Sequence, residues 1–346
     1  MINLKGLSWR SGACTIATGA LAASAWATPV YHIDAIPEGD GMLPTTAYGI
    51  NDEGVVVGEG YRSGASGAER KRPLPFRYQA GVLKRLSTGG VGSGSVAGIN
   101  KKGEMVGVRM YATTWSPKGK PQDMGDPPLC EGTLSAVDIN DDGESVGMIA
   151  CTPYRTAPGL YRAGVNTELP VLPGHDGGVA SAINNAGQVV GYSARSYNGP
   201  FVTRAFLWQG GVMQDLGTLG GKSSRANGIN NLGEIVGLAE DANDHSLPFI
   251  YRGGEMKPLP SCGSGLVQPA GLNEAGTVIG TLFPQGKSRA VIFEGPLCFH
   301  LQDLLDEGSA GWKLLTASDI NATGAIVGRG LLDGRERAYI ATRLSP

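Results

Sequence analysis

One pattern of apolar and polar positions recurs along the chain. Residues 183–191 show it: apolar Ile183 is followed by Asn184, Gly187 comes three residues later, and two β-branched residues precede Gly191. Apolar segments on either side of an Asn-x-x-Gly sequence predict two strands joined by a tight turn. In that turn Asn takes the first position and Gly adopts the left-handed conformation. We interpret each copy as a β-hairpin.

The pattern occurs seven times, always as (Ile/Leu)-Asn-x-x-Gly-x-x-(Val/Ile)-Gly. The turn asparagines are Asn51, Asn100, Asn140, Asn184, Asn230, Asn273 and Asn321, and successive ones are 40 to 49 residues apart. A period in the forties is typical of a four-stranded propeller blade. Two further strand-like segments follow each hairpin in most units, for example 205–208 and 212–216. They are weakest in the second unit, where they rest on 114–115 and 122–124.

The two ends of the repeat array complement each other. The seventh unit has its hairpin and third strand (337–342) but no fourth strand, and a lone strand-like segment at 31–36 precedes the first hairpin. We expect this segment to complete the seventh blade and leave no open sheet edge. The sequence thus predicts an all-β, seven-bladed β-propeller of four-stranded blades, closed by the N-terminal strand, in a single domain spanning 28–346. The alternative is an open or eight-unit array.

The first 27 residues resemble a signal peptide. Lys5 and Arg10 supply a positive start, residues 14–25 are apolar or small, and Ala25-Trp26-Ala27 forms an A-x-A cleavage site. That stretch is too short for a membrane anchor, and no later segment is long and apolar enough to span a bilayer. We expect a secreted or periplasmic protein, with the choice between these two compartments left open.

Composition narrows the class of protein. The chain of 346 residues has 55 glycines and only 17% charged residues, which favours a turn-rich β protein. Without residues 1–27 it keeps 27 basic and 31 acidic residues, a balance that argues against nucleic-acid binding. We expect a monomer with no cofactor and no metal site.

Four cysteines follow the expected cleavage site: Cys130, Cys151, Cys262 and Cys298. An even number in an exported chain indicates disulfides. We predict a Cys130–Cys151 bond, because a single hairpin separates two loops expected on the same face. We expect Cys262 and Cys298 on opposite faces, which disfavours a bond between them, and their pairing stays open.

The unit at 182–221 resembles the HAF family of bacterial extracellular repeats. The resemblance is carried by Ala182 to Ser193, then Arg204-Ala205-Phe206-Leu207-Trp208, then Asp215-Leu216-Gly217-Thr218-Leu219-Gly220-Gly221. The other units match more loosely, and together they cover nearly all of the chain after residue 27. The resemblance implies a secreted β-repeat protein of propeller-like units, and it implies no catalytic residue, substrate or cofactor.

Binding residues are expected on one face of the propeller. The Asn-x-x-Gly turns are short and uniform, whereas the loops of the opposite face, such as 59–74 and 192–203, are long and varied. Because ligand sites favour variable loops on a rigid scaffold, we expect a glycan or peptide to bind on this variable-loop face, around the axis. The candidates include Tyr154, His175, Tyr197 and Arg225. The alternative for each is an ordinary solvated loop residue.

Two carboxylates break the repeat. Asp138 and Asp319 stand just before Ile-Asn, where the other five copies have Gly or Ala. Both are expected to point toward the axis, from the third and seventh blades, where they would bind a ligand or a cation or act as acid and base. The alternative is that channel water or backbone groups satisfy them.

The sequence contains no G-x-S-x-G, H-E-x-x-H or P-loop motif. This favours a non-enzymatic extracellular binding or interaction protein. The alternative is a propeller enzyme acting on polysaccharide, a lyase or a hydrolase, because the propeller fold hosts both kinds of protein.

Overall fold

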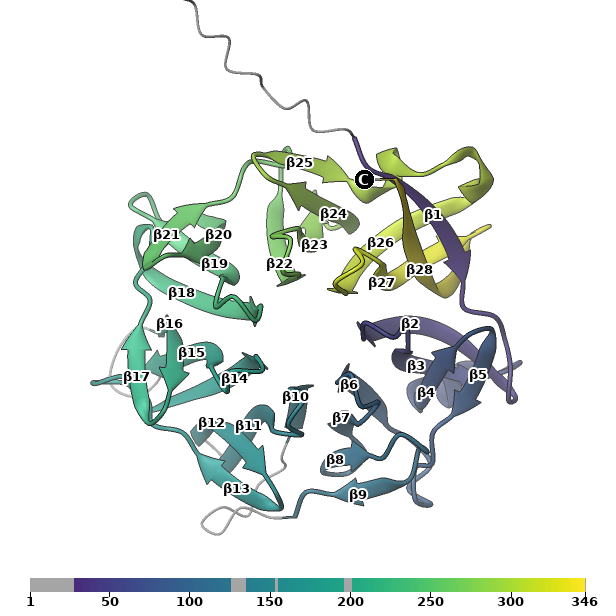
Figure 1. Cartoon of the computed structure of the whole chain (residues 1–346), viewed down its shortest axis with the longest axis horizontal. Helices are drawn as coiled ribbons and strands as arrows, with labels where there is room; N and C mark the ends of the chain where they lie inside the picture. Colours follow the sequence, from purple (N-terminus) through teal and green to yellow (C-terminus); the bar gives the residue numbers. More distant parts are fainter. Residues whose placement is uncertain (1–27, 126–134, 153–154, 196–200, 346) are drawn as a thin grey trace, which may run out of the picture.

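A computed structural model describes residues 28–125, 135–152, 155–195 and 201–345. Within these ranges the strands form seven four-stranded sheets around a central axis, which confirms the expected seven-bladed propeller (Figure 1). Neighbouring strands of each sheet run antiparallel, as in blade four. Among the described residues, no helix has the length and apolar character needed to cross a membrane. Residues 1–27, the expected signal peptide, lie outside these ranges.

Each blade begins with a hairpin of two inner strands, and the Asn-x-x-Gly segment forms its turn. The innermost strands are β2 (Met42–Ile50), β6 (Ser95–Ile99), β10 (Ser135–Ile139), β14 (Gly177–Ile183), β18 (Gly220–Ile229), β22 (Leu266–Leu272) and β26 (Trp312–Ile320). The second strands are β3 (Val56–Arg62), β7 (Met105–Val108), β11 (Ser145–Thr152), β15 (Val189–Arg195), β19 (Ile235–Asp241), β23 (Val278–Phe283) and β27 (Ile326–Leu332).

Two outer strands complete each blade. The third strands are β4 (Leu74–Gln79), β8 (Ala112–Trp115), β12 (Arg155–Arg162), β16 (Val202–Gln209), β20 (Ser246–Arg252), β24 (Arg289–Glu294) and β28 (Arg335–Ser345). The outermost strands are β5 (Val82–Arg85), β9 (Pro121–Asp123), β13 (Val165–Glu168), β17 (Val212–Asp215), β21 (Glu255–Pro258), β25 (Leu297–His300) and β1 (Val30–Ala35). Short 3-10 turns lie at η1 (Gly67–Lys71), η2 (Leu301–Leu304) and η3 (Glu307–Ser309).

Blade seven combines both ends of the chain. Its strand order is β1-β28-β27-β26, so the N-terminal strand is the outermost strand of the last blade, and Figure 1 shows them side by side. His32 pairs with Thr342 and Asp34 with Ile340 in this ladder. Tyr31 is fully buried in the core shared by blades six and seven. The expected closure by the N-terminal strand is confirmed.

The hairpin turns have the expected glycine conformation. The turn glycines are Gly54, Gly103, Gly143, Gly187, Gly233, Gly276 and Gly324, and each has a positive φ between 69° and 81°. A residue with a Cβ is strained at such a φ, so the turn requires glycine.

The second glycine of the repeat has a different role. A Cβ added at Gly191 would lie 2.0 Å from the carbonyl oxygen of Val179 on the neighbouring strand. The pairing of β14 with β15 shifts between Ala180 and Ala182, so the innermost strand has a β-bulge opposite this glycine. The bulge brings two backbones too close for any side chain.

The hydrophobic core lies between blades. One cluster joins Val190 and Ala205 of blade four to Phe249 and Tyr251 of blade five. A similar cluster packs Val327 of blade seven against blade one, so the last interface of the ring is as apolar as the others. Each blade thus buries its apolar faces only when both neighbours are present.

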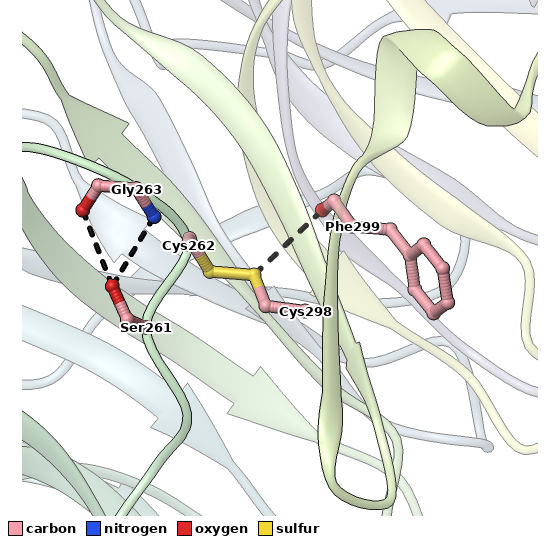
Figure 2. Close-up of a disulfide and its surroundings, with 5 residues drawn as sticks. All are labelled: Ser261, Cys262, Gly263, Cys298 and Phe299. Carbon is pink, nitrogen blue, oxygen red and sulfur yellow. Dashed lines mark hydrogen bonds between the residues drawn. A yellow bond between two sulfur atoms is a disulfide. The ribbon is translucent and has the colours of Figure 1, made fainter.

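The expectation for Cys262 and Cys298 was wrong. They form a disulfide with a Cα–Cα distance of 5.3 Å (Figure 2). The turn between β24 and β25 is only two residues long, because Glu294 pairs with Leu297, and this places Cys298 in the outer strand rather than in a loop. Cys262 is buried in the core shared by blades five and six, where it meets Cys298. The predicted Cys130–Cys151 bond lies outside the part of the chain whose side chains the structure describes.

Candidate functional site

A closed ring of hydrogen bonds surrounds the axis. The side-chain Nδ2 of each turn asparagine donates to the main-chain carbonyl oxygen of the turn asparagine in the next blade, as Asn184 does to Asn230 at 3.0 Å. The six other bonds run Asn51 to Asn100, Asn100 to Asn140, Asn140 to Asn184, Asn230 to Asn273, Asn273 to Asn321 and Asn321 to Asn51. All seven asparagines are buried.

The same side chains also fix their own turns. The Oδ1 atom of Asn184 accepts the backbone N–H groups of Ala186 and Gln188. Equivalent bonds hold the other turns, for example from the N–H of Val55 to Asn51. One asparagine therefore shapes a hairpin turn and links it to the next blade, which explains why this position does not vary among the seven units.

Asp138 and Asp319 line the axial cavity enclosed by this ring, as expected from their position. Asp138 lies in β10 and accepts two backbone N–H groups at 2.8 Å, from Ile139 of its own blade and Ile183 of the next. Asp319 lies in β26 and does the same with Ile320 and, across the junction to blade one, Ile50. Each carboxylate therefore bridges two adjacent blades.

Burial raises the pKa of both carboxyl groups. The pKa of Asp138 rises to about 6, although the amides of Ile183 and Ile139 oppose the shift. The pKa of Asp319 rises to about 7, and the negative charge of Asp138 adds to the effect of burial. Both groups thus change charge near neutral pH. Among the residues that the structure describes, no cluster of three or more His, Cys, Asp or Glu side chains could hold a metal ion.

Two neighbouring cavities with shared lining residues occupy the centre of the propeller. The axial cavity, of about 310 Å³, lies on the side of the Asn-x-x-Gly turns. The second, of about 380 Å³, lies toward the variable-loop face between blades one, six and seven, and we call it the entry cavity. Tyr48, Ala270 and Ser318 line both.

The entry cavity combines aromatic, polar and cationic side chains. The Tyr48 hydroxyl donates to Glu59 at 2.9 Å, and burial raises the pKa of this phenol above its ordinary value. Phe283 lies at the end of β23 and is 41% exposed. Arg329 comes directly after Gly328 on β27 and also lines the cavity. Gln268 and Thr46 also line the walls. The Arg329 guanidinium also lies 3.6 Å from the Glu336 carboxylate. An apolar ring, a cation and amide or hydroxyl groups around one cavity suit a small polar ligand.

The other candidate residues lie away from both cavities or outside the described ranges. Arg225 is exposed and stacks on the Tyr192 ring at 5.2 Å. His175 is partly buried, its Nδ1 finds no hydrogen-bond partner within the described part of the chain, and burial lowers its pKa. Neither lines the axial or the entry cavity. Tyr154 and Tyr197 lie outside the described residues.

The sequence patterns did not identify the residues of the entry cavity as candidates. Tyr48 and Arg329 stand at variable positions of the repeat, one before Gly49 and one after Gly328. Both belong to inner strands rather than to loops. Inner strands border the axis, so a large side chain at these positions of the repeat is the sequence signal that could have indicated a site there.

No family model and no curated protein matches the chain. Solved structures resemble it at low sequence identity. The β-propeller domain of the Trilobed protease from Pyrococcus furiosus is 12% identical with a TM-score of 0.56, over 92% of this chain and 96% of that one. Pyrococcus horikoshii acylaminoacyl peptidase is 13% identical with a TM-score of 0.56, over 87% and 52%. Puromycin hydrolase is 14% identical with a TM-score of 0.58, over 89% and 52%.

The chain spans about half the length of the last two proteins. At these identities the likeness shows a shared propeller fold and nothing about activity.

Proposed function

We propose that this chain is an exported, non-enzymatic binding protein that takes up a small polar ligand, a saccharide or a short peptide, through its variable-loop face. One observation carries the proposal: the entry cavity lies toward that face and shares Tyr48, Ala270 and Ser318 with the lining of the axial cavity. Phe283 offers an apolar surface for a sugar ring or a side chain, and Arg329 offers a charged donor.

The proposed export rests on the sequence. The resemblance of residues 1–27 to a signal peptide and of the repeat to the HAF family both favour a secreted or periplasmic protein. The Cys262–Cys298 bond is compatible with an oxidising compartment. N-terminal sequencing of the protein recovered outside the cytoplasm should begin at Thr28, and a cytoplasmic protein that keeps its first 27 residues would contradict export.

A glycan array and a peptide library should identify the ligand. We expect Arg329→Ala and Phe283→Ala to weaken binding by about tenfold or more. Arg335→Ala is the matched control, because Arg335 is an exposed arginine of the same blade that lines neither cavity. Equal loss in all three variants would contradict binding in the entry cavity.

Product analysis separates binding from catalysis. Binding with no change in the ligand supports the proposal. New reducing or unsaturated saccharide ends, or cleaved peptide, would instead indicate the alternative, a propeller enzyme. The shared fold with peptidase propellers does not favour that alternative, because the likeness is limited to the fold.

A further inference from the structure

Seven backbone amides point toward the axis. They belong to the residue before each turn asparagine, such as Ile229, which pairs across its hairpin with Ile235. The backbone N–H of the next residue, Asn230, donates to the main-chain carbonyl oxygen of Glu234. In an antiparallel ladder this makes Ile229 and Ile235 a non-hydrogen-bonded pair. The N–H of Ile229 therefore points away from the second strand. Since the first strand is the innermost of the blade, that direction is toward the axial cavity.

The protein's own carboxylates satisfy four of these seven amides. Asp138 accepts those of blades three and four, and Asp319 accepts those of blades seven and one, all at 2.8 Å. In each case one carboxylate bridges the amides of two adjacent blades. The structure thus shows twice that a carboxylate fits this arrangement.

Among the described residues, no side chain accepts the amides of Ile99, Ile229 and Leu272, and the hairpin register directs these amides away from the second strand. Ile229 and Leu272 belong to the adjacent blades five and six and line the axial cavity. Like the two amides that Asp138 bridges, they precede the turn asparagines of two adjacent blades. The difference is the preceding residue, which is Gly228 where blades three and seven have aspartate.

The missing side chains leave room for a guest group. A Cβ at Gly271 would meet no atom within 4 Å. At Gly228 a Cβ would lie 3.1 Å from the Cα of Gly271 and 3.2 Å from the carbonyl oxygen of Ala270, so a side chain there requires a backbone shift of a few tenths of an ångström. A Cβ at the equivalent Gly98 would have a similar spacing, 3.2 Å from the Cα of Asp138, so the inner strands of neighbouring blades approach each other alike at both places.

We propose that the amides of Ile229 and Leu272 bind the carboxylate of a ligand in the axial cavity. The two oxygens would accept one N–H each, as those of Asp138 and Asp319 do, and charge-assisted bonds of this kind are stronger than bonds to water. This inference rests on the proposed ligand-binding function and names the ligand chemistry. The carboxylate belongs to a uronic acid or to the C-terminus of a peptide.

Charge in the cavity makes this binding depend on pH. Asp138 and Asp319 line the cavity, as do Asp52, Asp141 and Glu274 at its mouth, with Lys101 as a cation. The raised pKa values of Asp138 and Asp319 mean that both lose negative charge between pH 8 and pH 5.5. A carboxylate ligand should therefore bind several-fold more tightly at pH 5.5 than at pH 8.

Amide NMR of the ¹⁵N-labelled protein provides the test. We expect titration with glucuronate or with N-acetylglycine to shift the signals of Ile229 and Leu272 and to leave those of Ile183 and Ile320 nearly unchanged. The neutral controls are glucuronamide and N-acetylglycinamide. The acid that binds more tightly identifies the source of the carboxylate, and shifts of equal size with the neutral amides would overturn the proposal.

A matched pair of variants tests the same site. Gly228→Asp should place a third carboxylate on the two amides and weaken binding of the acids at least tenfold, whereas Gly228→Ala should keep it, since blade four has Ala182 at this position. Unchanged binding in Gly228→Asp would overturn the proposal. If that variant does not fold, the wild-type titration still decides. If neither acid shifts the amides of Ile229 and Leu272 while saccharides still bind through Arg329, the carboxylate site is refuted and the proposed function is supported.

Discussion

The side-chain amide of Asn321 in blade seven donates a hydrogen bond of 3.1 Å to the main-chain carbonyl oxygen of Asn51 in blade one, 270 residues earlier. The other six bonds of the asparagine ring join consecutive blades, so this bond closes the ring. It works together with the ladder between β1 and β28, which joins the two ends of the chain within blade seven. The ring is therefore closed twice, by the Asn321–Asn51 bond at the axis and by the β1–β28 ladder at the outer edge.

Removing one asparagine of the ring should destabilise the whole propeller. Asn321→Ala deletes the bond to Asn51 and the acceptor for the N–H of Ala325, both in buried surroundings. We expect a loss of about 1–3 kcal/mol in the free energy of unfolding, measured by urea denaturation. Asn243→Ala is the control, because Asn243 is exposed. Equal midpoints for the two variants would show that the ring contributes little.

Deletion of residues 30–36 should open blade seven. It removes β1 from β28, exposes a sheet edge and strips Tyr31 and Ile33 from the core. We expect a large fall in the melting temperature. Tyr31→Ala should cost about 3–5 kcal/mol, since its side chain is fully buried, whereas the exposed Asp34→Ala should be nearly neutral. A deletion variant that melts within a few degrees of the parent would contradict the closure.

Two glycines of the inner strands should respond in opposite ways to alanine. Gly191→Ala forces a Cβ against the carbonyl oxygen of Val179 and should cost about 3 kcal/mol or more. Gly271→Ala meets open space and should change stability by about 0.5 kcal/mol or less. Thermal melting of both variants checks this, and similar losses would mean that the bulge opposite Gly191 relaxes easily.

The Cys262–Cys298 bond should stabilise the chain by closing a loop of 36 residues. In the entropic model a loop of this size is worth about 4 kcal/mol. We expect the double variant Cys262→Ser, Cys298→Ser to melt below the wild type without reductant. Peptide mapping of the unreduced wild type is the direct check and also tests the predicted Cys130–Cys151 bond. Free thiols at Cys262 and Cys298 would contradict the structure.

Stability should fall as pH rises toward 8 because of the two axial carboxyls. Their folded-state pKa values, about 6 for Asp138 and about 7 for Asp319, lie above the ordinary value of 3.8. The folded state therefore binds more protons than the unfolded state, and the stability that they contribute is complete below about pH 4 and is lost as pH rises through 7.

The variant Asp319→Asn isolates this effect. It cannot ionise, but it keeps only one of the two amide bonds, so it should be about 1 kcal/mol less stable than the wild type at pH 5. The difference should shrink or reverse at pH 8. Urea denaturation across this pH range checks it, with the exposed Asp34→Asn as the control. Parallel curves for Asp319→Asn and the wild type would show that Asp319 does not titrate in this range.

The repeat by itself determined the number of blades, the hairpin turns and the strand that closes the ring. These features depend on local chemistry, since a glycine at positive φ and flanking β-branched residues specify a hairpin wherever they occur. The sequence also showed that the last unit lacks a fourth strand and that an extra strand-like segment precedes the first unit. The position of Asp138 and Asp319 at the axis followed from the same alignment of units.

Only the tertiary structure decided which groups meet across blades. The bond from Asn321 to Asn51, the reach of Asp138 to Ile183, and the disulfide between Cys262 and Cys298 all join residues of different blades or of a blade and its connecting segment. Their partners depend on the bulge of the innermost strand and on the spacing that seven blades adopt around one axis. The entry cavity, with Tyr48 and Arg329 on its walls, exists only once blades one, six and seven are side by side, because no single repeat encloses it.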